Sequence, residues 1–332
     1  MKALVMTAPG NPDVLQVREL PIPSIHGRQL LVRLKAAGIN PLDTKLRARG
    51  TYFPERMPAI LGCDGAGIVA ATGPETKDYK AGDAVYFCNG GIGGHPGTYA
   101  EYAVVDERFA APKPTTLSFA QAAASPLVVI TAWEALHDRG RLQAGQRALI
   151  HAGAGGVGHI AIQLARLHGN QVCTTVSGGD KARFVGELGV DYVVDYRDSD
   201  FVEAVNDWSN GGVELAFDTV GGATFQRSVH CVRHYGDLIT LLQPGSDMDW
   251  KEARLRNLRV GFELMLTPMV YGLSAVQQHQ ADILRRCAEL FDAGKLRIHL
   301  ARTFPLDHAA EAHRIIEAGG MTGKLALVMN ER

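Results

Sequence analysis

The feature that most constrains the fold is a glycine-rich turn near the middle of the chain. Residues 148–158 read ALIHAGAGGVG, so a short apolar segment leads into Gly-x-Gly-x-x-Gly and then into an amphipathic helical pattern. In this context Gly153 permits a tight turn, Gly155 lets the backbone approach a pyrophosphate, and Gly158 allows close helix packing. Helix amides and the helix dipole favour an anion there. The turn therefore predicts a dinucleotide site formed by Gly153, Ala154, Gly155, Gly156, Val157 and Gly158; the alternative is a loop whose glycines serve packing alone.

Around this turn, apolar segments alternate regularly with helical patterns. Strands are expected at 148–151, 171–176, 192–195, 214–218 and 237–242, with helices near 156–168, 180–188, 199–208 and 224–234. Such alternation is typical of a doubly wound parallel sheet with helices on both faces.

The N-terminal part has a different pattern, because its apolar segments are short, often alternate, and are separated by turn residues. These strands are expected at 2–6, 29–36, 67–70, 83–87 and 98–105. They predict a mostly-β, partly barrel-like unit. The tail beyond residue 268 reads as helix, strand (297–301), helix (307–318) and strand (324–329). It is too small to fold alone, so we expect it to complete the N-terminal unit.

Composition argues against several classes of protein. The 34 Lys and Arg against 35 Asp and Glu give a net charge of −1, so no global field favours nucleic acid or an anionic membrane. The 5 cysteines are dispersed and never form a CxxC pair, which argues against a disulfide framework or a structural zinc lobe. The uncharged stretches 114–133 and 148–165 are too polar or too broken to span a membrane, and no signal-peptide pattern is visible. A cytoplasmic protein is the default expectation.

The end of the second strand of the alternating region indicates which dinucleotide is preferred. NAD sites usually place a carboxylate at that point, whereas this chain continues Ser177-Gly178-Gly179-Asp180-Lys181. Ser177 can hydrogen-bond a 2′-phosphate and Lys181 can supply its counter-charge, which favours NADPH. Against this, Asp180 would repel the phosphate if it pointed into the pocket. Lys181 and Asp180 can also be solvated residues of the next helix's first turn.

Several segments, in the right order, resemble the medium-chain dehydrogenase/reductases, in particular the quinone oxidoreductase (zeta-crystallin-like) branch. They read AAGINPLD at 36–43, LGCDGAGIV at 61–69, GDAVY at 82–86, GTYAEY at 97–102 and AGAGGVG at 152–158. The resemblance covers nearly the whole chain and implies an α/β fold. Residues 1–124 and 267–332 would form a GroES-like, mostly-β catalytic domain, and residues 125–266 a Rossmann domain with a doubly wound parallel sheet. It also implies a homodimer joined through Rossmann edge strands, for which 258–264 is the candidate.

The resemblance poses the question of a catalytic zinc ion. The zinc alcohol dehydrogenase branch uses Cys, His and Cys as ligands, and this chain has Asn40, Cys63 and approximately Leu127 at those positions. One thiol, even with the neighbouring Asp64, is too small a ligand set for zinc. We therefore expect a metal-free enzyme in which Cys63 packs in the core.

Without a Lewis acid, the accessible chemistry is reduction of an acceptor that is already polarised. The resemblance implies hydride transfer from NADPH to a quinone. The alternatives are reduction of the double bond of an alkenal, enone or enoyl thioester, then a zinc-type alcohol dehydrogenase, or a non-catalytic NADPH-binding structural or sensor protein.

The resemblance also carries roles to individual residues. Asn40 and Asp43 would lie at the nicotinamide end. Tyr52 would donate its hydroxyl to the acceptor oxygen, or else form an aromatic wall. Thr131 would contact the nicotinamide, or bond back to its own helix.

Two further positions are expected at the cofactor, and several loops at the acceptor. Tyr196 would lie near the adenosine phosphate or be a surface aromatic, and Val220 follows the fourth strand at the ligand-binding edge of the sheet. Acceptor specificity is expected to reside in residues 47–58, 89–97, 243–250, 262 and 264–271.

Overall fold

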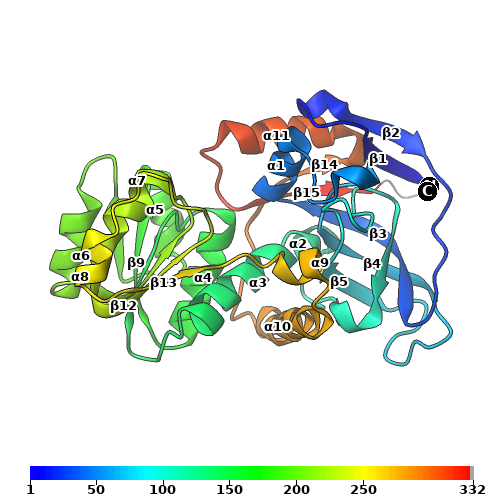
Figure 1. Ribbon diagram of the computed structural model, residues 1–332. Helices are drawn as coiled ribbons and strands as arrows, with labels where there is room; N and C mark the ends of the chain where they lie inside the picture. Colours follow the sequence, from blue (N-terminus) through cyan, green and yellow to red (C-terminus); the bar gives the residue numbers. More distant parts are fainter. Residues whose placement is uncertain (330–332) are drawn as a thin grey trace. The chain divides into compact units, whose positions relative to one another are not determined.

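The computed structural model describes residues 1–329, and the chain divides into two compact units (Figure 1). Unit 1 combines Met1–Leu127 with the C-terminal segment from Leu266, and unit 2 is Val128–Met265. The sequence-based division placed its breaks at 124/125 and 266/267. No helix within residues 1–329 has both the length and the apolar character needed to cross a bilayer.

Unit 2 is built on a six-stranded parallel sheet with the order β10-β9-β8-β11-β12-β13. Its strands are β8 (Arg147–Ile150), β9 (Gln171–Val176), β10 (Tyr192–Asp195), β11 (Val213–Asp218), β12 (Val232–Thr240) and β13 (Arg259–Phe262). Central side chains such as Leu149, Ala216 and Leu238 are fully buried, as expected for a sheet covered on both faces. The strand order reverses between β8 and β11, and ligands bind at the carboxyl ends of strands at such a point.

Helical segments precede and connect these strands (Figure 1). They are α3 (Pro126–Trp133), the π-helical turn η4 (Glu134–Arg139), α4 (Gly156–Leu167), α5 (Gly179–Gly186), α6 (Phe201–Ser209), α7 (Gly222–Ser228), η5 (Val229–Cys231) and α8 (Lys251–Leu255). The parallel Rossmann sheet is thus confirmed. The helix expected over 224–234 is wrong in its second half, because Val232 pairs with Val213 of β11 and starts β12. Tertiary pairing overrides the local helical pattern there.

Unit 1 contains a two-stranded and a seven-stranded sheet. The first pairs β1 (Lys2–Met6) with β2 (Leu15–Glu19). The second has the order β14-β15-β3-β4-β5-β7, with β6 also paired to β3. Its strands are β3 (Gln29–Ile39), β4 (Asp64–Thr72), β5 (Ala84–Cys88), β6 (Tyr102–Asp106), β7 (Ala110–Pro112), β14 (Leu300–Pro305) and β15 (Lys324–Val328).

The C-terminal tail completes unit 1, as expected, because β15 pairs antiparallel with β3 and β14 pairs parallel with β15. The strand expected at 297–301 is displaced: β14 begins at Leu300 and buries Phe304. The helical segments of unit 1 are η1 (Pro12–Val14), α1 (Pro41–Arg49), η2 (Pro54–Arg56), η3 (Glu107–Phe109), α2 (Phe119–Ala123), α9 (Thr267–Tyr271), α10 (Ser274–Asp292), η6 (Leu306–His308) and α11 (Ala309–Ala318).

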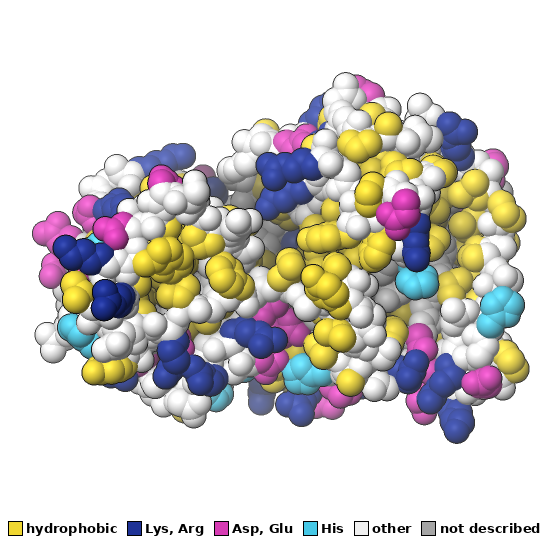
Figure 2. All heavy atoms as spheres, in the orientation of Figure 1, with side chains coloured by type: hydrophobic (Ala, Val, Ile, Leu, Met, Phe, Trp, Pro, Cys, Tyr) yellow, Lys and Arg dark blue, Asp and Glu magenta, His cyan; other side chains and the backbone are white. Residues whose placement is uncertain are grey.

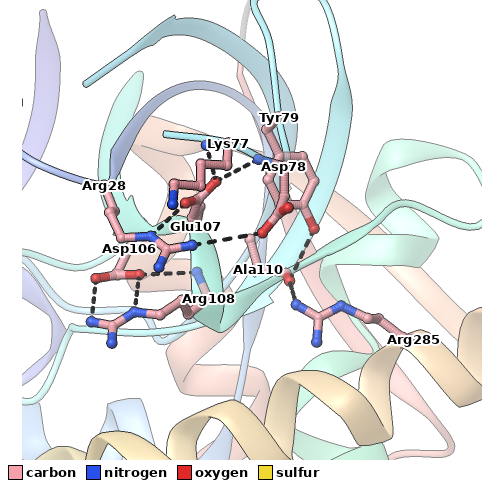
Figure 3. A network of polar contacts seen from close by, with 9 residues as sticks. All are labelled: Arg28, Lys77, Asp78, Tyr79, Asp106, Glu107, Arg108, Ala110 and Arg285. Atoms are coloured by element: carbon pink, nitrogen blue, oxygen red, sulfur yellow. Dashed lines mark hydrogen bonds and ion pairs between the residues drawn. The ribbon is translucent and has the colours of Figure 1, made fainter. Parts of the chain in front are cut away.

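A buried carboxylate holds the loop between β4 and β5 (Figure 3). Glu107 accepts hydrogen bonds from the backbone N–H groups of Lys77 at 3.0 Å and Asp78 at 2.9 Å. It also forms an ion pair with Arg28 at 2.6 Å. Because the donors come from the loop and from Arg28, just before β3, this one side chain of η3 ties three segments of unit 1 together.

Candidate active site and cofactor site

The glycine turn leaves β8 at the carboxyl edge of the unit 2 sheet. A Cβ on Gly158 would lie 2.3 Å from the Ala152 carbonyl oxygen, and a Cβ on Gly153 would lie 2.1 Å from Thr174 Oγ1, so both positions require glycine for packing. A Cβ on Gly155 would meet a single neighbour, the Ala152 oxygen at 3.1 Å, and otherwise points into open space. Gly155 caps α4 without any side-chain cap, so the first amides of α4 can bind an anion. The turn therefore fits a dinucleotide pyrophosphate.

A buried histidine, His151, lies between β8 and the glycine turn and holds the backbone there. His151 Nδ1 lies 3.0 Å from Thr175 Oγ1, and Nε2 lies 2.8 Å from Ser228 Oγ. Thr175 Oγ1 accepts from the Ala152 N–H, and the Ser228 hydroxyl donates to the Thr224 carbonyl, which leaves His151 Nδ1 as acceptor and Nε2–H as donor. Burial lowers the pKa of His151 to about 4, so the ring is neutral at pH 7. His151 is structural here, connecting β8, β9 and α7.

The predicted phosphate residues lie together after β9. Lys181 Nζ donates to Ser177 Oγ at 3.1 Å. Asp180 is exposed and forms an ion pair with Arg183, its neighbour on α5. This pairing offsets the negative charge that argued against a 2′-phosphate.

Sequence reasoning missed a second cation beside this turn. Arg197 is exposed, and its Nη1 lies 3.8 Å from where a Cβ on Gly178 would stand. The Gly178 N–H donates to Asp195 Oδ2 at 2.8 Å, which joins the end of β9 to the end of β10. Arg197 is the second residue after β10, the strand next to β9. A basic residue just after that strand was therefore the sequence signal that could have identified it. Tyr196, next to it, is 52% exposed.

The segment after β11 is held by one carboxylate. Asp218 accepts from the N–H groups of Val220 at 3.0 Å and Gly221 at 2.9 Å, and from the Thr240 hydroxyl at 2.7 Å. Thr219 Oγ1 donates to the His151 carbonyl at 2.9 Å. These bonds fix the backbone next to the glycine turn and leave Val220 47% exposed at the same edge.

In unit 1, Asn40 and Asp43 belong to one buried polar cluster at the start of α1. The Asn40 N–H donates to Asp43 Oδ2 at 2.8 Å, and Asn40 Nδ2 donates to Asp64 Oδ2 at 2.9 Å. Lys324 Nζ donates to Asn40 Oδ1, and to the Ile39 carbonyl at 2.8 Å. The Asn40 amide therefore joins an ammonium to a carboxylate.

Burial controls the protonation of this cluster. It raises the pKa of Asp43 to about 7, opposed by the Asn40 N–H and reinforced by the charge of Asp64. Burial also lowers the pKa of Lys324, although both carboxylates oppose that shift. Tyr99 lies beside Asp43, and its hydroxyl lies 3.1 Å from His313 Nε2. Asp43 can thus exchange a proton near neutral pH.

The residues at the zinc-ligand positions do not fit a zinc ion. The Asn40 amide is already bonded to Asp64 and Lys324, and Leu127 contributes a hydrocarbon side chain with its N–H bonded to Asp64 Oδ1 at 2.9 Å. A hydrogen bond with Cys88 opposes the shift, but burial and the nearby carboxylates raise the pKa of the Cys63 thiol and so disfavour a thiolate ligand. Across residues 1–329, no group of three or more His, Cys, Asp and Glu side chains is arranged to hold a metal.

The two remaining predicted residues lie elsewhere. Tyr52 is 43% exposed in unit 1, and its N–H donates to the Ile92 carbonyl at 3.0 Å, which joins two loops expected to set acceptor specificity. Thr131 is buried in α3 and belongs to unit 2. The structure thus brings Asn40 and Asp43 together and places Tyr52 on a separate loop of their unit.

Comparison with known proteins agrees with this architecture. A family model described as alcohol dehydrogenase GroES-like domain matches residues 26–115, and one described as zinc-binding dehydrogenase matches residues 188–327. Quinone oxidoreductase 1 of Escherichia coli is 30% identical over 322 residues, which cover 96% of this chain and 97% of that protein.

Two further relatives widen the comparison. A phenolphthiocerol/phthiocerol polyketide synthase protein of Mycobacterium tuberculosis is 32% identical over 98% of this chain, which spans 14% of that much longer protein. The crystal structure of Escherichia coli quinone oxidoreductase complexed with NADPH matches with a TM-score of 0.87 and 28% identity, over 99% of this chain and 100% of that one. The chain is an oxidoreductase that belongs to the medium-chain dehydrogenase/reductase superfamily, within its quinone oxidoreductase branch.

Proposed function

We propose that the chain is an NADPH-dependent, zinc-free reductase of quinones. The observation that carries this proposal is the Lys324–Asn40–Asp64 network: Asn40, at a position where the resemblance would place a zinc ligand, is bonded instead to an ammonium and a carboxylate. Such a cluster lacks the Lewis acid that stabilises an alkoxide, so it favours reduction of an acceptor that is already polarised.

The unit 2 residues support NADPH as the cofactor. NADPH, when bound, supplies a hydride. The glycine turn from Gly153 to Gly158 would hold its pyrophosphate. Ser177, Lys181 and Arg197 would hold the 2′-phosphate, because a hydroxyl and two cations converge there and Asp180 is paired with Arg183. Tyr196 and Val220 would border the adenosine and nicotinamide portions.

The unit 1 residues would orient the acceptor and supply protons. Asn40 is fixed by three hydrogen bonds and holds the acceptor side of the site in place. Asp43, with a pKa of about 7, would hold a proton at its carboxyl group. Tyr52 is 43% exposed, and its hydroxyl would donate to an acceptor oxygen. Thr131 would contact the nicotinamide from unit 2.

We further propose a homodimer through β13. This strand is at the end of the unit 2 sheet. Phe262, its last residue, is 57% exposed, and Leu264, two residues beyond it, is 48% exposed. An edge strand with exposed apolar side chains is suited to pair with a second copy. Sedimentation of the protein would show a dimer that Val260→Pro converts to a monomer.

The test of the proposed activity follows NADPH consumption by purified protein with an ortho-quinone and with a simple enal, with and without a strong chelator. Chelator-insensitive turnover of the quinone supports the proposal. Turnover that the chelator abolishes would point to a metal enzyme, and tight NADPH binding with negligible turnover to a structural or sensor role.

A second candidate acceptor is an enoyl thioester. The observation that favours it is a cavity of about 1000 Å³ in unit 1, much larger than a simple quinone needs, and a polyketide synthase is among the relatives.

A further inference from the structure

Beside Asp43, unit 1 buries a further group of polar side chains. Tyr99 comes from the loop before β6, Arg47 from α1 and His313 from α11, and α1 lies beside α11 (Figure 1). These three side chains belong to residues that are 0%, 2% and 0% exposed, respectively. Polar atoms buried so deeply destabilise the fold unless they are hydrogen-bonded. The partners of each atom therefore show how the group is connected.

The Tyr99 hydroxyl links His313 to Asp43. It lies 3.1 Å from His313 Nε2, and the two rings meet edge to face with their centroids 5.8 Å apart. Burial raises the pKa of Asp43, and a contact with the Tyr99 hydroxyl opposes that rise. Asp43 Oδ2 accepts from the Asn40 N–H, whereas Oδ1 is buried and has no hydrogen bond of normal geometry within residues 1–329. Oδ1 is therefore the acceptor open to the Tyr99 hydroxyl.

The direction of the hydrogen bonds follows from the chemistry of the two ends. An ionised Asp43 can only accept, so the Tyr99 hydroxyl donates to it and the Tyr99 oxygen accepts from His313. Burial and the charge of Arg47 lower the pKa of His313 to about 3, so its ring is neutral and has a single N–H. That proton is on Nε2, which leaves Nδ1 as an acceptor.

The outer nitrogen of His313 and the Arg47 guanidinium are chemically complementary. His313 Nδ1 and the Nε and Nη1 of Arg47 are buried, and none of them has a partner among the described residues. A water that accepts from an Arg47 N–H and donates to Nδ1 satisfies an atom on each side, and buried waters commonly make about three such bonds. This water would be a proton donor at the outer end of the imidazole.

The outer end of the group is at the protein surface. Arg47 Nη2 donates to Glu317, whose side chain is 37% exposed. Glu317 comes four residues after His313 on α11, so the two side chains lie on one face of that helix. Figure 2 shows basic and acidic side chains together at the surface over the region of α1 and α11. A polar line thus leads from solvent to the buried Asp43.

The other charged groups beside Asp43 are Asp64 and Lys324. Both are buried and both are bonded to Asn40, so they connect Asp43 to the interior of unit 1. Among these groups, the route through Tyr99 and His313 is the one that ends in solvent.

We propose that His313 and Tyr99 form a proton relay that carries protons from solvent at Glu317 to Asp43. This rests on the proposed reductase function, in which Asp43 holds a proton for the reduced acceptor. In one passage the water gives a proton to His313 Nδ1, the Nε2 proton moves to the Tyr99 oxygen, and the Tyr99 hydroxyl proton moves to Asp43. Each bond to hydrogen that breaks is replaced by one that forms, and no electron is transferred. The water regains its proton from solvent, and the relay resets when the imidazole turns over and the Tyr99 hydroxyl rotates.

Tyr99→Phe tests the relay because it removes the hydroxyl and keeps the ring. With an ortho-quinone as acceptor, we expect kcat for NADPH consumption to fall at least about tenfold, with unchanged NADPH affinity in calorimetry. The matched control is Tyr86→Phe. Tyr86 is also fully buried in unit 1, and its hydroxyl donates to the Leu284 carbonyl at 2.5 Å, outside the relay. Its substitution should leave kcat unchanged.

His313→Gly supplies a readout that a packing role would not move. It should lower kcat as Tyr99→Phe does, and added imidazole should restore kcat in proportion to its concentration, because imidazole accepts a proton at one nitrogen and donates from the other. The same amounts of 1-methylimidazole, which has no N–H when neutral, should not. Circular dichroism verifies that each variant is folded. If His313→Gly does not fold, His313→Gln takes its place with the same expected loss of kcat.

Each outcome has a distinct meaning. An unchanged kcat in Tyr99→Phe or in the folded His313 variant overturns the relay, and so does a loss that Tyr86→Phe shares or that imidazole fails to relieve in folded His313→Gly. In these cases the unmodified protein is active and the reductase function stands. If the unmodified protein reduces neither the quinone nor an enal, the proposed function itself fails, and the relay fails with it.

Discussion

Replacing Lys324 with methionine perturbs the unit 1 cluster most directly. The ammonium donates to Asn40 and to the Ile39 carbonyl, and Asn40 passes a hydrogen bond on to Asp64. Both Lys324 and Asp64 are buried, at 2% and 0% exposure, so the methionine leaves a buried carboxylate without a cation. Breaking a buried charge pair in this way costs about 3–5 kcal/mol.

Unfolding experiments measure how much stability Lys324→Met loses. We expect Lys324→Met to lower the free energy of unfolding of unit 1 by about 3–5 kcal/mol, which for a domain of this size corresponds to a fall in Tm of about 6–20 °C. Urea unfolding monitored by circular dichroism measures the free energy of unfolding, and calorimetry measures the Tm. The matched control is Lys45→Met, an exposed lysine of α1 for which we expect a change within about 0.5 kcal/mol.

A second substitution separates charge from packing. In Lys324→Met the Asn40 amide is free to turn, so that its oxygen can accept from an amide at position 64. Asp64→Asn in that background removes the unpaired charge and preserves a hydrogen bond with Asn40. The double variant should therefore be more stable than Lys324→Met alone. A loss under about 1 kcal/mol for the single variant, or a double variant destabilised by the sum of both changes, would refute the role given to Lys324.

Three further predictions concern protons, cofactor and acceptor. Because the pKa of Asp43 is about 7 in the fold and 3.8 ordinarily, the folded chain holds the extra proton between those values, so stability should fall by about 1.4 kcal/mol per pH unit as pH rises from 4 to 7. Asp43→Asn should remove this dependence of the unfolding free energy on pH, measured by urea unfolding at several pH values. If the dependence is unchanged in the variant, it belongs to another titrating group. Lys181→Ala and Arg197→Ala should each weaken NADPH binding in calorimetry about tenfold and NADH binding less than about twofold; equal effects on both cofactors would eliminate the phosphate role. Tyr52→Phe should lower the rate of quinone reduction about tenfold or more with unchanged NADPH affinity, whereas an unchanged rate would make Tyr52 a wall residue.

Local patterns were sufficient to predict the alternating part of the fold. The glycine turn, the apolar strands and their spacing placed β8, β9 and β10 within a residue or two, because each element is defined by neighbours in sequence. The segment 224–234 failed since Val232 is drawn into pairing with β11, which is a tertiary effect. Helix α1 was not expected, although Pro41 at its first position and Asn40-x-x-Asp43 across its start are a recognisable capping pattern.

The site was less predictable because it joins distant segments. Asn40 and Asp43 were identified by resemblance, but Lys324 lies 284 positions from Asn40 and reaches it through the pairing of β15 with β3. Arg197 belongs to a different strand end from Lys181, and only the parallel order of β9 and β10 places the two beside one turn. No local pattern contains such information.

The central claim is that this chain reduces a polarised acceptor with NADPH and without a metal. The most direct measurement is NADPH consumption with an ortho-quinone, before and after dialysis against a strong chelator, with the zinc content of the protein determined on the same sample. We predict the same rate in both and far less than one zinc ion per chain. A rate that disappears with the chelator and returns with zinc would contradict the account.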